Sequence, residues 1–213
     1  MDPQEPNELP IFELPLAIVP AERVPLHIFE ERYRLMMSHC LGEEAAFGIV
    51  LQDSDGARSV GCSARITEVI ERYDDGRLDI VVTGEEPFRV LDRFDAPDWP
   101  AAHVEMLPPA RGEADPGPTL DLARAAFAEL LQAVGAQPER ADAAGDAYSI
   151  AAQIEMPAGE KQALLESSGE AERLVALEAS LRKLIAGLER SRQLAERAKS
   201  NGHSKGRIGP IGS

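Results

Sequence analysis

The distribution of apolar residues changes at a proline-rich segment, residues 108–118, and this change limits the possible folds more than any other feature. Before it, apolar runs are short, rich in β-branched side chains and separated by turn residues, which is typical of β-strands. After it, Ala and Leu recur every three or four residues, which is typical of amphipathic helices. The sequence therefore predicts an α+β protein with a β-rich unit over residues 9–108, a helical bundle over 117–199 and a disordered tail over 200–213.

Five or six short strands in the first unit indicate a compact barrel or a folded sheet. One helix interrupts them: residues 30–41 carry apolar side chains at helical spacing, and Gly42 supplies an end signal. Tight turns are predicted at Asp74–Gly76, where Asp-Gly provides positive φ, and at Gly84–Pro87. The strands are expected at residues 47–51, 60–70, 78–82, 88–91 and 102–107.

The second half predicts helices over residues 120–134, 140–154 and 161–166, followed by one long helix. Ser167 and Glu170 have the spacing of a capping box before this long helix. Its leucines alternate at intervals of three and four, which favours a seam within the bundle over a coiled-coil dimer. A monomer or a weak dimer is therefore expected. The leucines are Leu174, Leu177, Leu181, Leu184 and Leu188.

The net charge of −15 disfavours a nucleic-acid-binding surface, because such surfaces depend on Lys and Arg. Residues 1–110 are especially acidic, with 22 acids against 9 bases. The two cysteines, Cys40 and Cys62, are too few for a disulfide framework, and the composition favours reduced thiols in a cytoplasmic protein over a single bridge. No apolar run is long enough to predict a membrane span.

Motifs for catalysis, cofactors and metals are missing or lack the required context. Residues 202–206 (GHSKG) match a nucleophile elbow, but that motif requires a preceding strand and a following helix. No P-loop or dinucleotide fingerprint occurs, and the histidines lack metal-ligand spacing, so we predict no cofactor, no metal and no catalytic residue. His27 is expected to be packed and hydrogen-bonded. An enzyme of another kind would require a pocket with perturbed acids.

Several segments resemble the N-terminal domain of Lon proteases. The resemblance begins in the first 33 residues and extends to about residue 190. It covers the segments 14–16 (LPL), 19–20 (VP), 24–33 (VPLHIFEERY), 47–50 (FGIV), 60–66 (VGCSARI), 87–90 (PFRV) and 156–166 (MPAGEKQALLE).

This resemblance implies a PUA-like β fold followed by a helical bundle, and a role in protein or peptide recognition. It carries over no catalytic residue, because the chain resembles a stand-alone substrate-binding domain without the ATPase and peptidase domains. The expected partners are unfolded or damaged proteins, or a protease or chaperone that the chain serves as an adaptor or regulator. RNA binding is the alternative, because PUA-like folds often bind RNA, although the acidic charge disfavours it.

The candidate protein-binding residues lie where the first helix begins: Leu26, Phe29, Glu30, Glu31 and Arg32. Apolar side chains surrounded by charged ones suit unfolded chains, which expose scattered hydrophobic groups. The alternative is structural: Leu26, Ile28 and Tyr33 would belong to the core, and Phe29 would fill the space under the helix.

Overall fold

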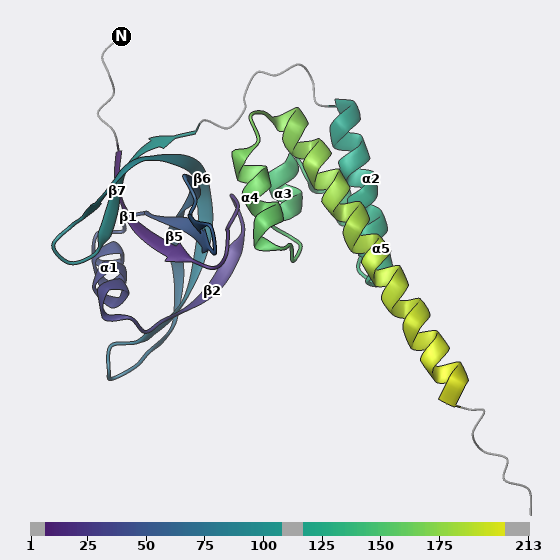
Figure 1. Ribbon diagram of the computed structural model, residues 1–213, viewed down its shortest axis with the longest axis horizontal. Helices are drawn as coiled ribbons and strands as arrows, with labels where there is room; N and C mark the ends of the chain where they lie inside the picture. The colour runs from purple at the N-terminus through teal and green to yellow at the C-terminus, as the bar shows by residue number, and fades with distance from the viewer. Residues whose placement is uncertain (1–6, 108–116, 203–213) are drawn as a thin grey trace, which may run out of the picture.

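The computed structural model describes residues 7–107 and 117–202, and within them all strands precede residue 107 while most helices follow residue 116 (Figure 1). This is the expected α+β class. The strands are β1 (Asn7–Leu14), β2 (Arg23–Ile28), β3 (Phe47–Asp53), β4 (Gly56–Ala57), β5 (Val60–Arg72), β6 (Leu78–Asp95) and β7 (Pro100–Met106). The helices are α1 (Glu31–Gly42), α2 (Gly117–Ala133), the 3-10 helix η1 (Pro138–Ala143), α3 (Ala147–Ala151), α4 (Ala158–Glu166) and α5 (Glu170–Gly202).

The strands form a closed barrel. They pair in the order β1-β7-β6-β5-β3, and β3 then pairs in parallel with β1, which completes the ring. The other pairings around the ring are antiparallel. Two further strands attach to this ring: the short β4 pairs with β3, and β2 pairs with β6. The expectation of a barrel is confirmed, although β1 and β2 were not expected as strands.

The predicted turn at Gly84–Pro87 is wrong, because β6 continues through this segment as one long strand. Its first half pairs with β2 and its second half with β7, while β5 accompanies both halves. Gly84 is needed for another reason: a Cβ there would lie 2.3 Å from the carbonyl oxygen of Val19. The glycine therefore lets the loop before β2 approach the strand. The turn at Asp74–Gly76 is confirmed, with Gly76 at a φ of +85°.

Helix α1 buries the side predicted from its apolar spacing. Tyr33, Met36, Met37 and Cys40 are all buried in the main core. The Tyr33 ring packs against Phe12 of β1, with ring centroids 4.2 Å apart. The helix thus closes over the interior of the barrel.

The helical part differs from the sequence expectation at two places. The predicted helix over 140–154 is wrong: η1 and α3 replace it, and Asp146 begins α3 by accepting a hydrogen bond from the Ser149 amide. The predicted capping box of Ser167 and Glu170 is also wrong. The amide and hydroxyl of Ser168 bond to Glu172 instead, at 2.9 and 2.6 Å. Helix α4 begins at residue 158, three residues earlier than expected.

The leucine stripe of α5 packs within the chain, as expected. Leu174, Leu177 and Leu181 are fully buried, whereas Leu184 and Leu188 are half-buried. Helix α5 runs alongside α2 and projects beyond it (Figure 1). The long helix reaches Gly202, so the prediction of a disordered tail over 200–213 is wrong for residues 200–202. Residues 203–206 of the GHSKG segment, the rest of the predicted tail and most of the predicted linker lie outside the described residues.

The barrel and the helices share one hydrophobic core. A single cluster of buried residues extends from Phe12 in the barrel to Leu177 in α5. Two polar contacts cross the same boundary: Lys161 of α4 forms a buried ion pair with Glu22, and the Gln162 amide donates to the Val60 carbonyl at 3.0 Å. The two parts are therefore joined by burial and by specific bonds.

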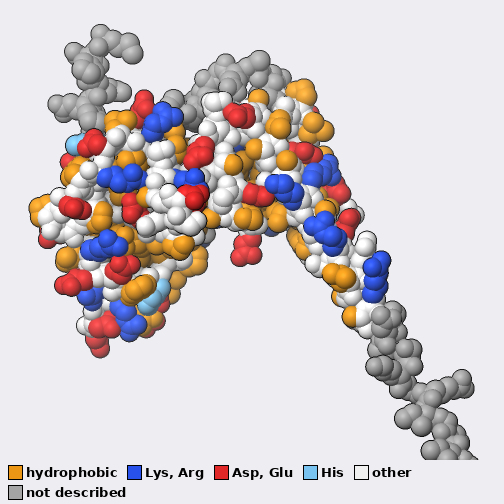
Figure 2. All heavy atoms as spheres, viewed as in Figure 1, with side chains coloured by type: hydrophobic (Ala, Val, Ile, Leu, Met, Phe, Trp, Pro, Cys, Tyr) orange, Lys and Arg blue, Asp and Glu red, His pale blue; other side chains and the backbone are white. Residues whose placement is uncertain are grey.

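The surface mixes charges of both signs. Figure 2 shows acidic and basic side chains interspersed over the β-rich part, and basic side chains following one another along α5. None of the helices within residues 7–107 and 117–202 is both long and apolar enough to cross a membrane.

Candidate functional site

The five candidate residues lie at the junction between β2 and α1. Leu26 belongs to the inner face of β2, opposite Ile80 of β6, and is half-buried against the main core. Phe29 follows the strand and is 62% exposed. Glu30, Glu31 and Arg32 begin the helix and are exposed. The structure therefore brings four of the five to the surface and turns Leu26 toward the core.

The structural alternative is confirmed for two residues and wrong for Phe29. Ile28 and Tyr33 are buried, as that alternative expects. Phe29 does not fill the space under the helix, because Tyr33 and the methionines of α1 already occupy the core. An aromatic side chain left this exposed on a folded domain is a candidate contact for a partner.

Phe29 is the exposed end of a small aromatic cluster. Its ring stacks on His27 with centroids 6.0 Å apart, and His27 meets the edge of Tyr73 at 6.1 Å. His27 is exposed, so the expectation that it is packed is wrong, although it does bond to Asp79 through Nδ1 at 2.5 Å. The Tyr73 hydroxyl donates to the same carboxylate at 2.7 Å.

These hydrogen bonds shift the pKa values of Asp79 and Tyr73. Bonds from His27 and Tyr73 favour the charged carboxylate and lower the pKa of Asp79. The bond to the carboxylate favours the protonated phenol and raises the pKa of Tyr73 to about 12. At neutral pH Asp79 is therefore an acceptor that holds His27 and Tyr73 in place beside Phe29.

A hollow of about 540 Å³ lies against the first turns of α1. Leu35, which is 46% exposed, and Pro97 are its apolar lining residues, while Glu30, Glu31 and Asp98 supply acidic groups. Arg32 crosses this surface with its guanidinium 4.4 Å from the Tyr33 ring centroid, and it forms an ion pair with Glu30 at 3.2 Å. We call Phe29, Leu35 and Arg32, with this hollow, the junction surface.

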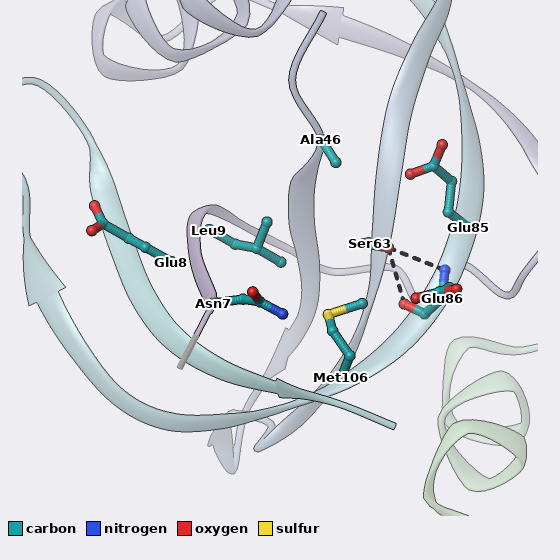
Figure 3. A pocket seen from close by; sticks show the side chains of 8 residues that line it. All are labelled: Asn7, Glu8, Leu9, Ala46, Ser63, Glu85, Glu86 and Met106. Carbon is teal, nitrogen blue, oxygen red and sulfur yellow. Dashed lines mark hydrogen bonds between the residues drawn. The ribbon is translucent and has the colours of Figure 1, made fainter. Parts of the chain in front are cut away.

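A second hollow, of about 680 Å³, opens at one end of the barrel (Figure 3). Its acidic side chains are Glu8, Glu85 and Glu86. The Ser63 hydroxyl accepts a bond from the Glu86 amide at 3.0 Å and donates to the Glu86 carbonyl at 3.1 Å. Because both bonds are made to backbone groups, this serine serves the strand pairing rather than a reaction. The remaining lining residues are Asn7, Leu9, Ala46 and Met106.

A third hollow, of about 570 Å³, lies between the C-terminal end of α2, the segment after α3 and the middle of α5. It is mainly apolar, and its lining includes Leu131, Val134, Leu184 and Leu188. Leu131 is buried, whereas Leu184 and Leu188 are half-buried and Val134 is exposed.

The part of the chain that the structure describes offers little reactive chemistry. Within residues 7–107 and 117–202, no three His, Cys, Asp or Glu side chains gather as metal ligands would. Both cysteines are free and buried, and burial raises the pKa of each thiol, to about 11 for Cys40. Such thiols stay protonated at neutral pH and are poor nucleophiles.

Sequence reasoning missed Tyr73 and Asp79, which come from the β5–β6 hairpin. They lie more than 40 residues from Phe29 and reach it only because β2 pairs with β6. One signal was available: Val24, Leu26 and Ile28 alternate as in a strand, but Pro25 interrupts the pattern.

Comparisons with known proteins agree with this architecture. Residues 8–183 match the sequence profile of the substrate-binding domain of the ATP-dependent protease La (LON). The structure is similar to that of a Lon N-terminal domain protein from Xanthomonas campestris, with a TM-score of 0.64 and 22% identity over 81% of this chain and 98% of the other. It is also similar to the N-terminal domain of the Mycobacterium avium complex Lon protease, with a TM-score of 0.71 and 19% identity over 83% of this chain and 98% of the other.

Proposed function

The chain belongs to the family of Lon substrate-binding domains, and from this premise we propose that it is a non-catalytic module that binds unfolded or damaged polypeptides through the junction surface. The observation that carries this proposal is Phe29, which is 62% exposed and directly precedes, in the chain, the charged residues that line the hollow with Leu35. Unfolded chains expose apolar side chains that folded proteins bury, and an exposed aromatic ring can contact them. The proposed role is that of an adaptor or regulator in cytoplasmic protein quality control.

The charges at the junction surface suit a binder of many sequences. Glu30 and Arg32 pair with each other at 3.2 Å, and the Arg32 guanidinium also covers the Tyr33 ring. Groups of both signs on a small area contact either charge on a ligand without requiring one sequence. The apolar contacts then supply most of the affinity, so binding should depend weakly on salt.

The test is fluorescence anisotropy with three labelled probes: a reduced, carboxymethylated protein that stays unfolded, the same protein in its native state, and a single-stranded RNA. Each is titrated at low and moderate salt. We expect selective, salt-tolerant binding of the unfolded probe. Binding of RNA alone, weakening steeply with salt, would replace the proposal by RNA binding.

The residues are tested with the double variant Phe29→Ala, Arg32→Glu. Leu122→Ala is the matched control, because Leu122 is 60% exposed but lies on α2. Truncating such exposed side chains changes the free energy of unfolding by about 0.5 kcal/mol or less, so both proteins should fold. Affinity for the unfolded probe should fall about tenfold in the double variant and stay unchanged in the control. Equal affinities would refute the role of the junction surface.

A further inference from the structure

Strand β2 has one free edge. It pairs with β6 along its whole length, and among the described residues no other strand pairs with it. Neither does any helix there pack against it to a comparable extent. In Figure 1 it lies at the margin of the barrel. A free strand edge presents unpaired backbone groups and can accept another strand.

The direction of these backbone groups follows from the neighbouring bonds. Just before the start of β2, Gly84 of β6 directs both of its backbone groups toward the β2 side. Its carbonyl accepts from the Ala21 amide at 2.8 Å, and its amide donates to the Glu22 carbonyl at 2.9 Å. Val81 directs its carbonyl the other way, to the Thr67 hydroxyl of β5 at 3.3 Å. Even-numbered residues of β6 therefore bond to β2.

The even-numbered residues of β6 lie opposite Val24, Leu26 and Ile28, so these three residues of β2 form the backbone hydrogen bonds to β6. Arg23, Pro25 and His27 then direct their backbone groups outward. Pro25, which has no amide hydrogen, is thus at a position where none is needed. The edge offers two amides, of Arg23 and His27, and three carbonyls. Within residues 7–107 and 117–202 the structure gives none of these five groups a hydrogen-bond partner.

The side chains of β2 define what the edge accepts. Val24 and Leu26 pack against the core but remain half-buried. An added strand would lie about 4.8 Å away and place every second side chain beside them. Apolar side chains at those positions of the added strand would complete the burial of Val24 and Leu26. Phe29, which directly follows the last residue of β2, would lie beside the end of the added strand.

We propose that an extended segment of an unfolded polypeptide, with apolar residues at alternate positions, adds to β2 as a further strand. The proposal rests on the proposed function and deepens it by naming the binding mode and the ligand pattern. Backbone hydrogen bonds recognise any sequence, which a binder of unfolded chains requires, and Val24 and Leu26 select for apolar alternation. It also gives Leu26 a role, at the edge of the added strand.

The first experiment measures amide hydrogen exchange of the isotope-labelled protein by NMR, with and without an unlabelled peptide in which valine alternates with threonine and lysine stands at each end. Without peptide, the Arg23 and His27 amides should exchange fast, while the Val24 and Leu26 amides are protected by the ladder. Saturating peptide should slow exchange at Arg23 and His27 by tenfold or more. Unchanged exchange at both amides while the peptide is bound would overturn the proposal.

Two sets of variants separate the backbone from the side chains. Arg23→Pro with His27→Pro removes both outward amides, whereas Arg23→Ala with His27→Ala keeps them and removes the side chains. The proline pair should weaken peptide binding about tenfold relative to the alanine pair. Equal affinities of two folded variants would overturn the proposal. Because the proline pair could fail to fold, a second test changes the peptide instead of the protein. Two peptides are N-methylated at alternate residues, one at the odd and one at the even positions. If both bind as tightly as the unmodified peptide, the proposal of strand addition is overturned.

The outcomes distinguish this mode from the proposed function. The unfolded probe could bind in a way that depends on Phe29 while neither the proline pair nor N-methylation of the peptide changes the affinity. That result would retain the proposed function and refute strand addition. If neither the unfolded probe nor the peptide binds, both fail. Protection of the Arg23 and His27 amides without peptide, together with a dimer mass, would assign the edge to a second copy of the chain and overturn the proposal.

Discussion

Replacing Lys161 by methionine should lower the free energy of unfolding by about 3 kcal/mol, because the change leaves the buried Glu22 carboxylate without its positive partner. The Lys161 and Glu22 side chains are only 11% and 10% exposed, and they pair across the boundary between α4 and the barrel. Removing one member of a buried pair costs about 3–5 kcal/mol. We take the lower end, because Glu22 still accepts a hydrogen bond from the Val19 amide at 3.1 Å.

A double-mutant cycle isolates the pair itself. Glu22→Gln keeps an acceptor for the Val19 amide but removes the charge, and its combination with Lys161→Met leaves no buried ion. The double variant should therefore be more stable than the sum of the single changes predicts, by about 1–3 kcal/mol. Lys183→Met is the control, because Lys183 pairs with Glu160 at 3.2 Å with its side chain 70% exposed, and should cost about 1 kcal/mol or less.

The assay is urea unfolding followed by two probes. Fluorescence of the single tryptophan, Trp99, reports on the barrel, and circular dichroism at 222 nm reports mainly on the helices. The two transitions should coincide in the wild type, because one core joins both parts. A coupling energy below about 0.5 kcal/mol, as large as the usual error of additivity, would refute the reasoning that this pair is buried and interacting.

Three further predictions concern packing, thiols and a phenol. Gly61→Ala should lower the free energy of unfolding, measured in urea, by about 3 kcal/mol, because the added Cβ would lie 2.5 Å from a backbone oxygen of β3. Gly159→Ala, at a position in α4 with open space around it, should raise that free energy by about 0.5 kcal/mol or more. Cys40 and Cys62 should react with a thiol reagent at pH 8 only slowly until urea is added, because burial raises both pKa values; fast reaction of the folded protein would contradict this. Tyr73, with its pKa raised to about 12, should stay protonated at pH 10–11, and the free energy of unfolding should fall above about pH 10, because the unfolded phenol ionises first. Comparing the absorbance titration at 295 nm with that of Tyr73→Phe checks this, and ionisation of Tyr73 near pH 10 would refute it.

The helix α1 shows how local patterns succeed. Its apolar spacing, its acidic first turn and Gly42 at its end all lie within a dozen residues, and the structure agrees to within one residue at either end. Helical periodicity, the dipole and end signals act within one segment, so no tertiary information is needed to find it.

Strand β2 and the predicted helix over 140–154 show where local patterns fail. Pro25 obscured β2, because a proline usually argues against a strand, and only the position of β2 at an edge makes it harmless. In the second case an Ala-rich segment has high helix propensity, but Gly145 and the capping of α3 by Asp146 divide it. Helix propensity is a weak preference, and these capping signals outweigh it here.

The candidate site was predicted in part for the same reason. Phe29 and Arg32 are neighbours in sequence, so the motif placed them together without knowledge of the fold. Whether Phe29 is buried or exposed was undecidable from the motif, because Tyr33 competes for the same space in the core. Tyr73 and Asp79 required the pairing of β2 with β6.

The sequence by itself determined the α+β class, helix α1, the leucine seam of α5 and the resemblance to the Lon substrate-binding domain, because these depend on spacing along the chain. Only the tertiary structure decided the closure of the barrel by β1 and β3, the exposure of Phe29, the free edge of β2 and the ion pair of Lys161 with Glu22. Each of these depends on which distant segments meet. Such contacts follow from the packing of the whole core and leave no periodic signal in the segments that form them.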